Sequence, residues 1–89
     1  MSADRIDQRF FEFAETGDVE LRNELVVANQ GLALAFARRY RDRGVPLDDL
    51  EQVALEALVR SVDRFDPHLG LRFSTFAART IEGQLKQYF

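Results

Sequence analysis

The 89-residue sequence contains no cysteine and one histidine, His68. Without cysteine the chain cannot form disulfides, use a thiol nucleophile or bind zinc or an iron–sulfur cluster through thiolates. One histidine cannot build a histidine-rich metal site, and histidine is the usual acid–base group near neutral pH. No glycine-rich phosphate loop is present. We therefore expect no metal, no cofactor, no catalytic residue and no enzymatic activity.

Proline, glycine and long apolar runs are scarce as well. There are two prolines and five glycines, and the longest apolar run, residues 31–37, is far shorter than a membrane span. The first seven residues lack the apolar stretch of a signal peptide. With 46% hydrophobic and 30% charged residues, the chain has the composition of a soluble globular domain. We expect a single domain over residues 1–89, located in the cytoplasm and without membrane contact.

Apolar residues recur at helical spacing, whereas the alternation typical of strands is missing. The pattern predicts an all-α fold, a compact bundle of about four helices over 3–15, 19–43, 49–65 and 75–88. Asp18, Asp48 and Ser74 are the predicted N-caps of the last three. Gly31 lies inside the longest helix, where it permits close packing or a bend. The stripes predicted to face the core include Phe10, Phe13, Ala14, Leu21, Leu25, Ala28, Leu32, Ala35, Phe36, Leu50, Leu58, Ala77, Ile81, Leu85 and Tyr88.

The net charge of −3 argues against nucleic-acid binding, but the charge is unevenly distributed. Residues 1–30 carry seven acids and three bases, whereas residues 60–89 carry five bases and three acids. The outward face of the last predicted helix combines an aromatic ring, cations and a glycine, which suits single-stranded nucleic acid. The residues are Phe76, Arg79, Gly83, Lys86 and Gln87. Alternatively, Phe76 packs under the preceding loop and the cations are solvated, and the residues alone favour neither interpretation.

Two further groups of residues have alternative interpretations. The outward face of the third helix carries Leu55 and Val59 among polar residues, which is typical of a modest protein contact. Composition alone slightly favours the alternative that Leu55 extends the core. Arginines 38, 39, 41 and 43 end the second predicted helix. Cations suit the negative end of a helix dipole, which is a sufficient explanation, while a DNA contact is the alternative.

Several linked motifs resemble region 2 of bacterial RNA polymerase sigma factors of the sigma-70 family. They are LVV at 25–27, ARRY at 37–40, GVPLDDLEQV at 44–53, DRFDP at 63–67 and GLRFSTFA at 70–77. The resemblance covers nearly the whole chain and is firm from Asp18 onward. IEGQL at 81–85 is similar to the alternative stress-response and sporulation group. His68-Leu69 departs from the acidic–basic pair common in the family, which removes one cation from this turn.

The resemblance implies a role in transcription initiation: the domain docks on the β′ clamp coiled coil of core RNA polymerase and recognises and helps melt the −10 promoter element. It implies polymerase contacts for Asp48, Asp49, Glu51, Gln52, Leu55, Glu56 and Val59. It implies contacts with the non-template −10 strand for Phe65, Phe73, Phe76, Arg79, Gly83 and Lys86. An anti-sigma factor is a further implied partner. The alternative is a helical protein-binding module, or sigma-like decoy, that binds an anti-sigma factor without any DNA function.

Overall fold

The computed structural model describes the backbone of residues 2–89 and the side chains of residues 8–89. In this part of the chain there are five α-helices, one short 3-10 helix and no strand. The elements are α1 (Ser2–Thr16), α2 (Val19–Ala28), α3 (Gln30–Arg38), α4 (Leu47–Arg64), η1 (Pro67–Leu69) and α5 (Phe73–Lys86). The all-α prediction is confirmed. None of the described helices combines the length and apolarity needed to cross a membrane.

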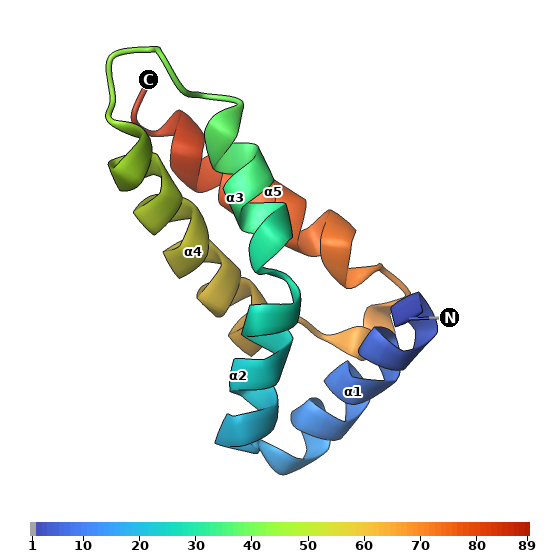
Figure 1. Ribbon diagram of the computed structural model, residues 1–89. Helices are drawn as coiled ribbons and strands as arrows, with labels where there is room; N and C mark the ends of the chain where they lie inside the picture. Colours follow the sequence, from blue (N-terminus) through green and yellow to red (C-terminus); the bar gives the residue numbers. More distant parts are fainter. Residues whose placement is uncertain (1) are drawn as a thin grey trace.

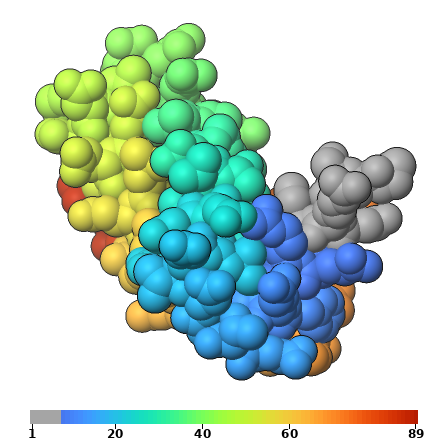
Figure 2. All heavy atoms as spheres, turned by 60° about the horizontal axis from the view of Figure 1, so that its bottom comes forward, coloured from blue at the N-terminus to red at the C-terminus, as the bar shows by residue number. Residues whose placement is uncertain are grey.

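The helices form an elongated bundle of 41 × 24 × 23 Å. Helices α3, α4 and α5 pack on one another along its length, while α2 packs on α4, and α1 folds back along α2 to reach η1 (Figure 1). In the space-filling view, α1 and α2 lie side by side at one end, and the loop after α3 forms the other end (Figure 2). This arrangement leaves long faces of α4 and α5 uncovered by other helices.

The core runs through all five α-helices. Leu25, Leu50, Leu58, Ile81 and Leu85 are fully buried. Most residues of the predicted stripes of α4 and α5 are buried as expected, among them Leu50, Leu58, Ala77, Ile81 and Leu85. Three predictions are wrong: Ala14, Ala28 and Ala35 are exposed. The prediction for Tyr88 is also wrong: this residue is 53% exposed and does not complete the inner stripe of the last helix.

The predicted helix over 19–43 is interrupted at Asn29. The Asn29 side-chain amide donates a hydrogen bond of 2.7 Å to the carbonyl of Leu25, and its backbone leaves helical geometry at φ −112° and ψ 6°. An asparagine side chain that bonds to the preceding turn competes with the helical pattern. The bend therefore lies at Asn29 and not at Gly31. It also rotates the inward face of α3, which buries Ala33 and Ala37.

The ends of three helices also differ from the prediction. Helix α3 ends at Arg38 instead of residue 43. Helix α4 begins at Leu47 after Pro46, so Asp48 lies in the first turn and makes no capping hydrogen bond. Helix α5 begins at Phe73, one residue before the predicted cap Ser74, because Phe73 is drawn into the core at the first helical position. Proline and large apolar residues therefore decide these helix starts.

The predicted cap at Asp18 is confirmed, since its carboxylate accepts a hydrogen bond of 2.9 Å from the Glu20 backbone N–H. We expect Asp18→Ala to lower the free energy of unfolding by about 0.5–2 kcal/mol, the usual loss for an N-cap. Asp48→Ala is the matched control, and it should cost less because that side chain makes no cap bond. Urea titration of both variants measures the difference, and equal losses would contradict this assignment of the caps.

Candidate functional site

Three phenylalanines from different elements pack together where α1 meets the start of α5. The Phe10 ring stacks on Phe73 at 4.4 Å between centroids and meets Phe65 edge-on at 5.1 Å. Phe65 and Phe73 are also edge-to-face, at 5.3 Å. Phe73, for which the resemblance implies a DNA contact, is only 2% exposed, so its ring lies inside the cluster and not on the surface. The buried Phe73 ring packs against the inner side of the Phe65 ring.

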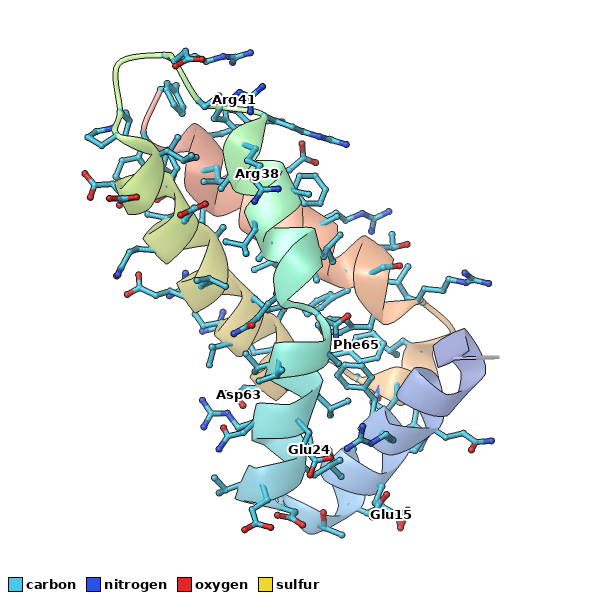
Figure 3. The ribbon with its side chains drawn as sticks, viewed as in Figure 1. Glu15, Glu24, Arg38, Arg41, Asp63 and Phe65 are labelled. Carbon is cyan, nitrogen blue, oxygen red and sulfur yellow. The ribbon has the colours of Figure 1, made fainter. Side chains whose placement is uncertain are left out.

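Phe65, a member of this cluster, and Phe76, which lies beside it, are both half-exposed. Their centroids lie 5.6 Å apart with the rings tilted by 44°. Phe65 caps the C-terminal end of α4, and Phe76 lies in the first turn of α5, so the interhelical turn brings them together. Figure 3 shows Phe65 near the centre of this end of the bundle. Phe76 is half-buried, so both the open-face interpretation and the packed one are partly right.

A hollow of about 200 Å³ adjoins Phe65 on the side of α1. The turn that shapes it is held by Asp66, whose carboxylate accepts a hydrogen bond of 2.9 Å from the His68 backbone N–H. His68 itself lies in this turn and meets Phe11 edge-on at 5.0 Å. The apolar stripes of the sequence do not predict that α1 contributes to this hollow, although the adjacent phenylalanines at 10 and 11 place one ring inward and one outward. The hollow is lined by Phe11, Phe65, Pro67, Gly70, Leu71 and Arg72.

The cations predicted for the α5 face are available. Arg79 and Lys86 are exposed, and Gly83 lies between them on the same helix. The two ion pairs among the described side chains, Arg9–Glu24 and Arg22–Asp63, involve neither cation. A Cβ atom added at Gly83 would meet nothing within 4 Å, so the packing of this chain does not require glycine there. Gly83 leaves free space on this face of α5.

The α4 surface, defined as Asp48, Asp49, Glu51, Gln52, Leu55, Glu56 and Val59, lies along one helix. The two aspartates, Gln52 and Glu56 are exposed, and the other three are half-buried. Leu55 packs against the core, as the alternative interpretation predicted, whereas Val59 lies outside that cluster. A hollow of about 390 Å³ opens on this surface, and Tyr88 forms part of its wall. Tyr88 therefore joins the α4 surface, although its spacing had indicated a core residue.

Known proteins with a similar sequence identify the family of this chain. The sigma-70 region 2 family matches residues 25–89. The chain is 42% identical over 69 residues to an RNA polymerase sigma-F factor of Kitasatospora aureofaciens, which covers 78% of this chain and 23% of that protein. It is 37% identical over 79 residues to the RNA polymerase sigma-G factor of Bacillus subtilis, covering 89% of this chain and 30% of that protein.

The sigma-F factor of Bacillus subtilis is 35% identical over 75 residues, which is 84% of this chain and 29% of that protein. Among the curated relatives it matches, the chain spans between 23% and 65% of their length. The family match covers α3, α4, η1 and α5 and the last four residues of α2, and α4 and α5 carry the two candidate surfaces. The chain therefore belongs to the sigma-70 family, of which it carries region 2.

Proposed function

We propose that this chain acts in transcription initiation, by docking on the β′ clamp helices of RNA polymerase through α4 and capturing the non-template −10 strand through α5. The observation that carries the proposal is that the two surfaces lie on adjacent packed helices and do not share residues. A common core of α4 and α5 side chains joins them. Polymerase binding through one helix therefore leaves the other helix free to meet DNA.

On the α4 surface, the chemistry supports contact with another protein. Val59 supplies an apolar patch, and Gln52 and Glu56 surround it with exposed polar groups. Interfaces of this kind pair an apolar centre with a polar rim. The half-exposed ring of Tyr88 beside Gln52 adds an aromatic group, a residue type enriched at interface centres. An anti-sigma factor that bound the same surface would exclude polymerase.

On the α5 side, the chemistry supports contact with an unpaired strand. Phe76 offers a ring for stacking, and Phe65 stands beside it as a wall. A base leaves the duplex at least cost when the strand is already open, and a stacked aromatic ring then stabilises it. Arg79 and Lys86 lie farther along α5, where they can meet phosphates. The hollow beside Phe65 offers space for a second base that has left the duplex, and Arg72 forms part of its wall.

The docking proposal predicts that a bulky cation on the α4 surface weakens clamp binding. We expect Gln52→Arg and Val59→Arg each to lower affinity for a β′ clamp fragment by about tenfold, because a bulky cation disturbs the packing of the apolar centre at Val59 and of the polar rim at Gln52. Titration of the clamp fragment measures this. Gln30→Arg is the matched control, because Gln30 is exposed at the start of α3. Unchanged affinity for both α4 variants, with helicity intact, would reject the surface.

A further inference from the structure

The arginine loop, defined as residues 38–43, carries four arginines and one aspartate, Asp42. Since α3 ends at Arg38, most of this segment lies beyond the helix. The attraction of a helix dipole falls off within the last turn. It can therefore account for Arg38 but not for Arg41 or Arg43. The helix dipole, which is a sufficient explanation if the helix extends to residue 43, therefore does not explain the whole cluster.

The four arginines lack carboxylate partners within the described side chains. The ion pairs found in residues 8–89 join Arg9 to Glu24 and Arg22 to Asp63, at other places in the fold. Neither Asp42 nor the aspartates at the start of α4 take part in one. Like charges held close together without counter-charges destabilise a compact state. The cluster therefore presents exposed cations that no carboxylate of the described side chains neutralises, and an external anion could pair with them.

Aromatic contacts fix the loop against the end of α5. The guanidinium carbon of Arg39 lies 4.6 Å from the centroid of the Phe36 ring, and that of Arg43 lies 5.3 Å from Tyr40. Tyr40 in turn stacks on Phe89 at 5.4 Å. Arg38 and Arg41 are exposed and have no such ring beneath them. Figure 3 shows these two side chains at the end of the bundle opposite Glu15 and Glu24.

The position of the loop follows the proposed path of DNA along α5. From Phe76 to Lys86 the helix rises about 15 Å at 1.5 Å per residue. That distance equals roughly four or five base-pair steps of B-form DNA at 3.4 Å each, and an unstacked strand spans it with fewer nucleotides. The arginine loop lies beyond Lys86, against Phe89, on the side away from the ring that would stack on the opened strand. The resemblance to sigma factors implies that Arg79, Gly83 and Lys86 lie near the upstream edge of the −10 element, so DNA that continued past Lys86 would be upstream and double-stranded.

We propose that the arginine loop binds the phosphate backbone of duplex DNA immediately upstream of the melted segment. Arg38 and Arg41 make the phosphate contacts, while Arg39 and Arg43 hold the loop on its aromatic supports. Guanidinium groups suit this task because they stay charged and present several donors to phosphate oxygens. A phosphate contact carries no sequence specificity, but it fixes the position of the duplex on the protein. The inference rests on the proposed capture of the −10 strand by α5.

The test uses this chain bound to core RNA polymerase and three DNA probes. The first probe is the single-stranded −10 segment alone. The second and third carry the same segment joined to an upstream duplex of about three and about twelve base pairs. The longer duplex exceeds one helical turn. We expect Arg38→Gln combined with Arg41→Gln to weaken binding of the longest probe roughly tenfold or more, and to flatten its log–log salt slope by about 1.8, or 0.9 per lost phosphate contact. Binding of the single-stranded probe should not change, and the loss on the three-base-pair probe should be smaller than that on the longest probe, because the short duplex offers fewer upstream phosphates.

The matched control is Arg38→Lys with Arg41→Lys, which keeps the charge and should retain the salt slope. Equal losses on all three probes, or no loss on the longest, would overturn the arginine-loop proposal. Loss of core polymerase affinity that is independent of the probe would assign the loop to a protein contact and overturn it as well. If the unchanged chain with polymerase does not bind the single-stranded probe, the proposed capture by α5 is what fails.

Discussion

Phe76→Ala will reduce promoter opening by polymerase carrying this domain about 5-fold to 150-fold, while initial attachment to the promoter stays nearly the same. Stacking of a base on an aromatic ring contributes about 1–3 kcal/mol, and 1.4 kcal/mol is tenfold. That energy is gained only as the base leaves the duplex. The loss should therefore appear in the opening step. Permanganate reactivity or a fluorescent base within the −10 element reports it directly.

Two control variants separate stacking from packing, because Phe76 is half-buried and stands 5.6 Å from Phe65. Phe76→Tyr keeps a ring and should open promoters almost normally. Phe76→Leu keeps most of the apolar contact with the domain but has no π-face for a base. It should behave like the alanine variant in opening and like the original chain in thermal unfolding. Normal opening by Phe76→Ala would instead favour a module that binds proteins alone.

The largest loss of stability is expected at Phe10. Its ring is 1% exposed and touches both Phe65 and Phe73, so Phe10→Ala should lower the free energy of unfolding by about 3–5 kcal/mol. The residual cavity would also loosen the two rings beside the hollow. Chemical denaturation measures the effect. Phe11→Ala is the matched control, since that neighbouring ring is 38% exposed and should lose far less. Similar losses for both would contradict the assignment of Phe10 to the core.

Much of the fold could be predicted from the spacing of apolar residues. The stripe containing Leu58 and Val62, and that containing Ile81 and Leu85, recur at helical intervals, and all four residues are buried. Periodicity locates faces well because burial depends on the direction of each side chain. It does not detect a side chain that bonds to its own backbone. The break at Asn29 was missed for that reason, and with it the rotation of α3.

The candidate site was less predictable, because its residues come together through tertiary packing. Phe73 and Phe76 belong to the same motif, yet one ring is buried and the other half-exposed. Only the position of Phe10 explains the difference, since its ring covers Phe73 from another helix. Tyr88 shows the converse case: helical spacing assigned it to the core, but α5 ends at Lys86 and the following turn leaves its ring on the α4 surface. Such outcomes depend on contacts distant in the sequence.

Because α1 packs on the rest of the domain, the buried core starts earlier in the sequence than the match to the family model. The match to the family model begins at residue 25, whereas among the described side chains the core already includes Phe10 and Leu21. A recombinant fragment trimmed to the shared segment would therefore uncover the apolar rings of Phe65 and Phe73. Newly exposed apolar patches of this kind promote self-association in soluble proteins. The segment that matches the family model is thus shorter than the part of the chain that packs around these rings.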